Sequence, residues 1–141
     1  GAVSVVNAFV PLMRNRGKVI LLNSILGKIP MMGSAVYCAS KAGLEHFADA
    51  TELELKRKGR NLTVKNIYPA YVKTPMLDEV TQNGRTFLKP VETNTVSRAI
   101  TALSEDSDAS NHNGYLLSRD RLIVALYKYL PTLYKKVVTS L

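Results

Sequence analysis

Three residues in the first third of the chain have the types and the spacing needed to move a proton at a substrate oxygen. Tyr37 and Lys41 are four positions apart, so on a helix they lie on one face about one turn apart. An ammonium beside a phenol favours the phenolate, which would let Tyr37 take up or release a proton near neutral pH. Ser24 stands thirteen residues before Tyr37 and can hydrogen-bond the same oxygen. The pattern predicts acid–base chemistry at a carbonyl or alcohol, although a Tyr-x-x-x-Lys pair also arises by chance in ordinary helices.

The elements around these residues are predicted from apolar patterns. Lys18 to Asn23 is almost continuously apolar, which is typical of a strand covered on both faces, and it leads into Ser24. Leu26 to Met32 is predicted to be a loop, because glycine and proline mark it. Ser34 to Lys58 is predicted to be a long helix whose first turns carry the tyrosine and the lysine.

The rest of the chain is predicted to form shorter elements. They are a helix at Val3 to Asn15, a strand at Leu62 to Tyr68, a polar and mobile segment at Thr74 to Lys89, a helix at Pro90 to Leu103, a solvated loop at Glu105 to Asn113 and a strand at Tyr115 to Ser118. The length of 141 residues and the composition agree with one piece of a globular α/β protein.

Three sequence blocks resemble the short-chain dehydrogenase/reductase family. They are Gly17 to Ser24, Tyr37 to Leu44 and Tyr68 to Pro75, in the family's order and at its spacing. The resemblance implies an α/β fold with a doubly wound parallel sheet of the Rossmann type. It places residues 1–118 in the C-terminal half of that domain, about three strands with flanking helices, and leaves residues 119–141 as a basic amphipathic extension.

The resemblance also implies an activity. The protein would be an oxidoreductase that transfers a hydride between a nicotinamide cofactor, NADP or NAD, and a small carbonyl or alcohol substrate. Tyr37 would be the acid/base, Lys41 would keep the phenol acidic and bind the nicotinamide ribose, and Ser24 would orient the substrate. Relatives with similar apolar tails act on lipid carbonyls, so the substrate is expected to be lipophilic, and the protein is expected to be a homo-oligomer.

Further contacts to cofactor and substrate are implied by the third block and by the loop after the serine. Three residues match positions that hold the nicotinamide in the family: Pro69, Val72 and Thr74. Three more are expected to line an apolar substrate pocket: Met31, Met32 and Tyr71. Ala70 departs from the family, because glycine at that position permits backbone angles that alanine resists.

Two family features are missing from this sequence. No glycine-rich turn opens a helix to receive the cofactor pyrophosphate. The family's catalytic asparagine is expected just before Gly1. We therefore expect this chain to be the catalytic and substrate-binding half of a longer reductase. The alternative is a non-catalytic fragment that acts only as a dimerisation or lipid-surface interaction module.

The charge and the histidines bear on two further kinds of partner, nucleic acids and metal ions. The formal net charge is +8, but the basic residues gather in local clusters, at Lys56 to Arg60 and at Lys135 and Lys136, as is usual for solvated helix ends. No nucleic-acid module or aromatic stacking pattern accompanies them, so no nucleic-acid partner is expected. His46 and His112 have no second ligand at zinc spacing, so no metal site is expected.

The tail from Asp120 to Leu141 carries an approximate apolar stripe of helical spacing, which Pro131 is expected to break or kink. The stripe can cover the body of the protein, a partner subunit or a substrate entrance, and it is also the candidate for peripheral contact with a membrane. Cys38 is a lone cysteine, either a small buried filler or a reactive thiol. A lone cysteine fits a reducing compartment, the cytoplasm or the cytoplasmic side of a membrane.

Overall fold

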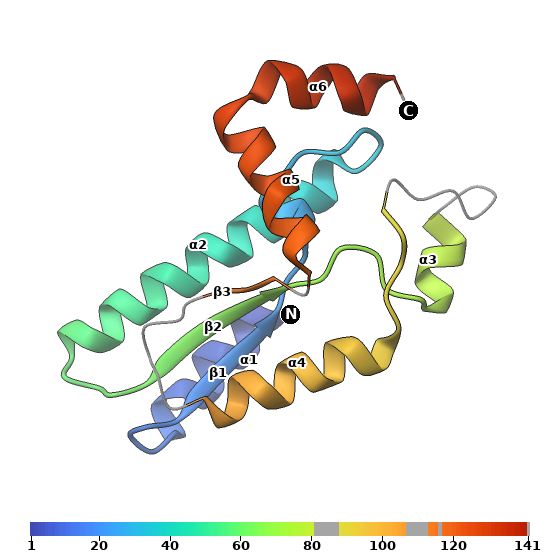
Figure 1. The fold of residues 1–141 in the computed structure, drawn as a ribbon. Helices are drawn as coiled ribbons and strands as arrows, with labels where there is room; N and C mark the ends of the chain where they lie inside the picture. The colour runs from blue at the N-terminus through green and yellow to red at the C-terminus, as the bar shows by residue number, and fades with distance from the viewer. Residues whose placement is uncertain (81–87, 107–112, 116, 141) are drawn as a thin grey trace.

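The computed structural model describes residues 1–80, 88–106, 113–115 and 117–140 (Figure 1). Three parallel strands form its sheet, in the order β1 (Lys18–Leu22), β2 (Thr63–Tyr68) and β3 (Asn113–Tyr115). Parallel neighbours need a crossover connection, which α2 (Ala35–Arg57) supplies between the first two strands and α4 (Thr93–Glu105) between the last two. The expected α/β class with a small parallel sheet is confirmed.

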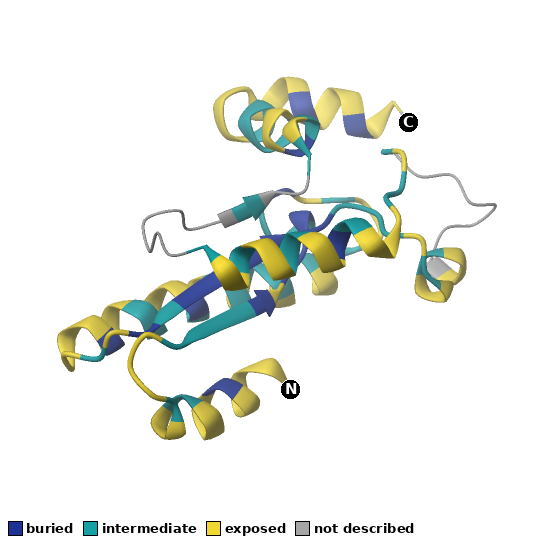
Figure 2. Ribbon diagram, turned by 60° about the horizontal axis from the view of Figure 1, so that its bottom comes forward, coloured by how far each residue is buried: buried dark blue, intermediate teal, exposed yellow. Residues whose placement is uncertain are grey.

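Helices cover both faces of this sheet. α1 (Ala2–Phe9) and α2 share one face, and α4 packs against β1 on the other (Figure 1). The core on the first face consists of Val6, Leu21, Ala48, Leu55, Leu62 and Val64. Figure 2 shows the buried residues on the sheet and on the inner sides of the helices, while the outer sides are exposed. Helices thus lie on both faces of β1, as its sequence predicts, although Leu22 at its end is 54% exposed.

The first helix is shorter than the predicted range of Val3 to Asn15. α1 ends at Phe9, and a 3₁₀ turn, η1 (Val10–Leu12), follows before the chain becomes extended at Met13. Proline lacks the amide proton for the α-helical hydrogen bond and clashes with the preceding turn. Pro11 therefore ends the α-helix and is accommodated at the start of the 3₁₀ turn.

Other predicted bounds also differ from the structure, and the helix predicted at Pro90 to Leu103 is α4, Thr93–Glu105. The loop after Ser24 contains a 3₁₀ turn, η2 (Ile25–Gly27), and the segment predicted to be polar and mobile begins with a helix, α3 (Pro75–Val80). Residues 81–87 of that segment lie outside the described part of the chain. The last strand is predicted at Tyr115 to Ser118, but β3 is Asn113–Tyr115, because these are the residues that pair with Asn66 to Tyr68 of β2.

The tail forms two helices, α5 (Ser118–Tyr129) and α6 (Pro131–Thr139), and the predicted break at Pro131 is confirmed. One side of α6 is buried: Tyr134 and Val138 pack with Ile25 and Ile29, in the loop beyond Ser24. The Tyr134 hydroxyl donates a hydrogen bond to the Pro30 carbonyl at 2.7 Å. In the described ranges, no helix combines the length and the apolar character needed to cross a bilayer.

The carboxyl end of α4 is stabilised by two lysines of the sheet. Lys18 donates through Nζ to the carbonyls of Leu103 and Ser104, the latter at 2.7 Å. Lys65 is completely buried in β2, and its Nζ lies 3.4 Å from a carboxylate oxygen of Asp106. Cations are favoured at a helix carboxyl end, where unpaired carbonyls and the helix dipole are negative. Lys18 and Lys65, which contribute to the net positive charge, therefore stabilise the fold.

We predict that Tyr134→Phe will lower the free energy of unfolding by about 1 kcal/mol, because it removes one hydrogen bond and keeps the packed ring. The measurement is urea denaturation followed by circular dichroism. Tyr129→Phe is the matched control, because Tyr129 is 71% exposed whereas Tyr134 is 1% exposed. Equal effects of the two substitutions would contradict an anchoring role for the Tyr134 hydroxyl.

Candidate active site

The predicted site residues lie beyond the carboxyl ends of β1 and β2. One residue, Asn23, separates Ser24 from the end of β1, and Pro69 directly follows the end of β2. The two segments are joined, because the amide of Ile25 donates to the Pro69 carbonyl at 2.9 Å. This edge of an open parallel sheet is the usual place for ligands, because the connecting loops leave a crevice there.

Ser24 is buried and caps the short turn η2. Its Oγ accepts a hydrogen bond from the amide of Leu26 at 3.2 Å. A serine hydroxyl that accepts one hydrogen bond keeps its own proton for donation. Ser24 is therefore held in place by a local cap and retains the donor that a substrate oxygen would need.

Tyr37 and Lys41 lie in the first two turns of α2. The Lys41 Nζ is 5.6 Å from the centre of the Tyr37 ring, and it donates to the Leu22 carbonyl at 3.4 Å. Tyr37 is 44% exposed, so its phenol is accessible to a ligand. Partial burial lowers the pKa of the Lys41 ammonium. The structure thus brings the tyrosine and the lysine together and directs the lysine toward the end of β1.

The predicted cofactor segment is braced by a second loop. Val72 forms an isolated parallel bridge with Val91, made by Val91 N donating to the Tyr71 carbonyl and Lys73 N donating to the Val91 carbonyl, both at 2.9 Å. Backbone groups of successive residues in such a bridge face opposite sides, so the Val72 amide faces away from Val91. Thr74 Oγ1 donates to the Val72 carbonyl at 3.4 Å.

The three residues predicted to line the substrate pocket differ in their surroundings. Met31 is partly buried and packs against the cluster of Tyr134 and Val138, whereas Met32 is exposed. Burial raises the pKa of Tyr71. Burial, with Cys38, Tyr71 and Tyr127 nearby, raises the pKa of Tyr134 to about 12. Met31 therefore packs with the tail helices, Tyr71 is close enough to Tyr134 to affect its pKa, and Met32 is exposed.

Two residues that the sequence analysis did not single out connect these parts. Asn23 is buried between β1 and Ser24, and its side chain bonds to the backbone of Ser24 and of Lys41. Gly27 lies directly against α2, because a Cβ there would be 2.9 Å from the Lys41 carbonyl oxygen. An amide at the end of an apolar strand was the available signal for Asn23. The contact of Gly27 has no signal in the sequence.

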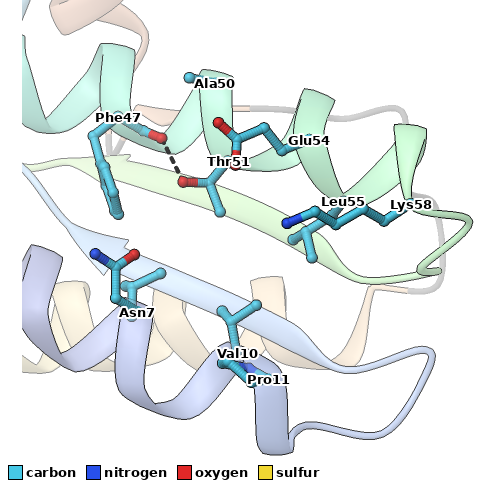
Figure 3. Close-up of a pocket in the computed structure, with 10 residues that line it drawn as sticks. Asn7, Val10, Pro11, Phe47, Ala50, Thr51, Glu54, Leu55 and Lys58 are labelled. Carbon is cyan, nitrogen blue, oxygen red and sulfur yellow. Dashed lines mark hydrogen bonds between the residues drawn. The ribbon is translucent and has the colours of Figure 1, made fainter.

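The groove between α1 and α2 is separate from this site (Figure 3). It has a volume of about 400 Å³, and Phe47, Thr51 and Leu55 face it from α2 while Asn7 and Val10 face it from the other side. None of the predicted catalytic residues lines it. In the described ranges, no three histidine, cysteine or acidic side chains gather as a metal site would require.

A comparison with protein families identifies the fold. Residues 1–85 match the family described as short chain dehydrogenase, a range that includes every predicted site residue. The chain belongs to the short-chain dehydrogenase family. The resemblance drawn from the three sequence blocks is confirmed.

Two curated short-chain dehydrogenases illustrate the similarity. The chain is 38% identical over 79 residues to 17-beta-hydroxysteroid dehydrogenase type 6 of Bos taurus. The aligned segment covers 55% of this chain and 24% of that protein. The chain is 36% identical over 75 residues to the 3-oxoacyl-(acyl-carrier-protein) reductase FabG of Rickettsia felis. This aligned segment covers 52% of the chain and 30% of that protein. The matched segment is thus a minor part of each relative.

A solved structure shows the same fold over nearly the whole chain. A short chain dehydrogenase from Burkholderia cenocepacia J2315, crystallised in complex with NADP, superposes with a TM-score of 0.74 at 19% identity. The match covers 94% of this chain and 52% of that one. This short-chain dehydrogenase chain therefore spans about half the length of its structural neighbour.

We predict that Gly27→Ala will lower the free energy of unfolding by roughly 1–3 kcal/mol, because its Cβ would overlap the backbone of α2 at Lys41. Gly43→Ala is the matched control. Gly43 lies in α2, and no neighbouring atom is within 4 Å of the position that a Cβ would take, so alanine there is expected to stabilise by about 0.5–1 kcal/mol. Urea denaturation measures both, and a stabilising effect at Gly27 would contradict the close contact.

Proposed function

We propose that this chain carries the catalytic and substrate-binding half of an NAD(P)-dependent oxidoreductase that interconverts a carbonyl and an alcohol. The observation that carries the proposal is that Lys41, which lies near the Tyr37 ring on the first turns of α2, is tied through Leu22 and Asn23 to the segment that contains Ser24. Membership of the short-chain dehydrogenase family supports the reaction class.

The residues present fit the nicotinamide end of a dinucleotide. The Val72 amide faces away from its bridge with Val91 and is positioned to donate to a carboxamide, and Thr74 lies beside it. The partly buried Lys41 ammonium is a suitable donor to ribose hydroxyls, and Pro69 would pack against the ring. A bound nicotinamide would supply or accept the hydride at the substrate carbon. The choice between NADP and NAD stays open.

The side chains of this chain would handle the proton. Ser24 would donate a hydrogen bond to the substrate oxygen, which fixes that oxygen beside the Tyr37 phenol. Tyr37 would donate its proton as a carbonyl is reduced and accept one as an alcohol is oxidised. Lys41 would stabilise the phenolate that forms in the first case, because its ammonium is held near the ring by the Leu22 carbonyl.

The substrate proposed is a small lipophilic carbonyl or alcohol. Met31 packs against the apolar cluster built on Tyr134, Tyr71 is close enough to Tyr134 to affect its pKa, and Met32, the neighbour of Met31 in sequence, is exposed. Similarity to a steroid dehydrogenase and to a 3-oxoacyl reductase suggests two probe classes, a steroid ketone and a 3-oxoacyl thioester.

We also propose a homo-oligomer that uses the outer surface of α1 and α2. Phe9 at the end of α1, Leu12 of the turn η1 and Leu53 of α2 are exposed apolar side chains. The groove of Figure 3 runs between the same helices. A second copy of the chain would bury these side chains.

The tail is proposed to touch an anionic membrane surface. We call Lys128 to Val137 the elbow: its apolar side chains Tyr129, Leu130, Leu133 and Val137 are exposed, and Lys128, Lys135 and Lys136 are exposed beside them. Across residues 118–140 the one acidic residue, Asp120, is buried. Apolar and aromatic side chains flanked by lysines suit the interface of a negatively charged bilayer.

We also propose that the protein works in a reducing location, either the cytoplasm or a membrane surface that faces it. A further proposal is that the chain divides between residues 118 and 119, where the dehydrogenase half ends and the tail extension begins.

Tyr37→Phe is predicted to lower turnover by about 10²- to 10⁴-fold, because the hydroxyl that exchanges the proton is removed. Turnover is measured by the change in nicotinamide absorbance with a steroid ketone and with a 3-oxoacyl thioester, using NADPH and NADH separately. Tyr129→Phe, at the exposed elbow, is the matched control and should keep wild-type turnover. Undiminished turnover in folded Tyr37→Phe protein would refute the mechanism.

The chain is predicted to sediment with phosphatidylserine-containing vesicles and to be released at high salt. Charge reversal of Lys135 and Lys136 to glutamate should weaken binding about tenfold or more, because each basic residue near such a surface contributes about 1 kcal/mol. The same reversal at Arg57 and Lys58, exposed at the far end of α2, is the control. If the chain stays in the supernatant with anionic vesicles, the lipid contact is wrong.

A further inference from the structure

A buried asparagine joins the two halves of the proposed active site. Asn23 directly follows the last residue of β1, and it is 4% exposed. Its backbone amide continues the strand ladder by donating to the Ile67 carbonyl at 2.9 Å. A side-chain amide in such a place costs free energy unless its donors and its acceptor find partners.

The Asn23 side chain makes three hydrogen bonds to three different segments. Its Oδ1 accepts from the amide of Ser24 at 3.0 Å, and its Nδ2 donates to the Lys41 carbonyl at 3.2 Å. The same Nδ2 donates to Oδ1 of Asn66, a buried residue of β2, also at 3.2 Å. One amide group therefore links the serine segment, the tyrosine helix and the neighbouring strand.

Two further contacts join Lys41 to the backbone on either side of Asn23 and Ser24. The Lys41 Nζ donates to the carbonyl of Leu22, the residue before Asn23. Gly27, at the end of the turn that Ser24 caps, lies against the Lys41 carbonyl so closely that a Cβ would be 2.9 Å from it. The main chain and the side chain of Lys41 are thus both held by the segment from Leu22 to Gly27.

We propose that Asn23 is a positioning residue for the proposed reaction, which sets Ser24 and Lys41 at a fixed separation through its single amide. The proposal rests on the proposed function and adds a residue to it. Asn23 is buried and would touch neither substrate nor cofactor. It acts because Ser24 must reach the substrate oxygen from one element while Lys41 supports Tyr37 from another, and small displacements of such groups are costly to turnover.

The chemistry of the amide determines which substitutions are informative. Asn23→Ala removes all three bonds. Asn23→Asp keeps the size and the oxygen that accepts from Ser24, but it places a second oxygen against the carbonyl of Lys41 and Oδ1 of Asn66. Asn61→Ala is the matched control, because Asn61 is exposed and precedes the amino end of β2, at the opposite end of the strand from the site.

The first measurement is steady-state kinetics on whichever carbonyl probe the wild-type protein reduces. We expect Asn23→Ala and Asn23→Asp each to lower kcat at least tenfold with KM within about threefold, while Asn61→Ala matches wild type. Wild-type kcat in either folded Asn23 variant would overturn the proposal. If those variants keep turnover and Tyr37→Phe loses it, the proposed function stands and the role of Asn23 falls.

The second measurement needs no turnover. Protein labelled with ¹³C at the lysine ε-carbons is titrated by NMR, and the Lys41 midpoint is compared between wild type, Asn23→Ala and Asn61→Ala. We expect the midpoint to rise only in Asn23→Ala, toward the value for a solvated lysine, because the partly buried position of Lys41 is lost. An unchanged midpoint in folded Asn23→Ala would overturn the positioning of Lys41, even if no carbonyl probe is reduced.

Discussion

Parallel pairing of β1 with β2 forces the chain to leave the sheet at Leu22 and to return through a crossover helix before Thr63. The site depends on this constraint. The crossover begins beyond the carboxyl end of β1, so the first turns of α2 lie beside the residues that follow the strand. Tyr37 and Lys41 occupy those turns, and Ser24 and Pro69 leave the two strands at the same edge. The pairing therefore brings together residues that are far apart along the chain.

Buried polar groups make this arrangement specific. The central strand β2 contains two adjacent buried polar residues, Lys65 and Asn66, and each has a defined partner: the Asp106 carboxylate for the first and Asn23 for the second. Successive side chains of a strand point to opposite faces, so a slip of one residue would exchange these partners for apolar surroundings. The cost of unsatisfied buried polar groups then opposes any other register.

The tail shows how one apolar stripe can serve two surfaces. Tyr134 and Val138 are buried against the loop beyond the serine, whereas Leu130 and Leu133 remain exposed. Pro131 starts a new helix at the point where the first one ends, which redirects the stripe. The inner side gives the proposed substrate loop a rigid neighbour, and the outer side leaves apolar and basic side chains together in solvent.

The sequence by itself determined the fold class, the strand before Ser24, the long helix with Tyr37 and Lys41, the break at Pro131 and the family, because local patterns and spacings encode these features. The early end of α1 before Pro11 and the helix that begins at Pro75 had local proline signals that were not used. The position of β3 had no such signal, since pairing with β2 decides it. Only the tertiary structure decided that Tyr134 packs on the loop after Ser24 and that Asn23 and Gly27 hold Lys41. Those contacts join residues from separate elements, and their energy depends on the distances that packing sets, which no local pattern records.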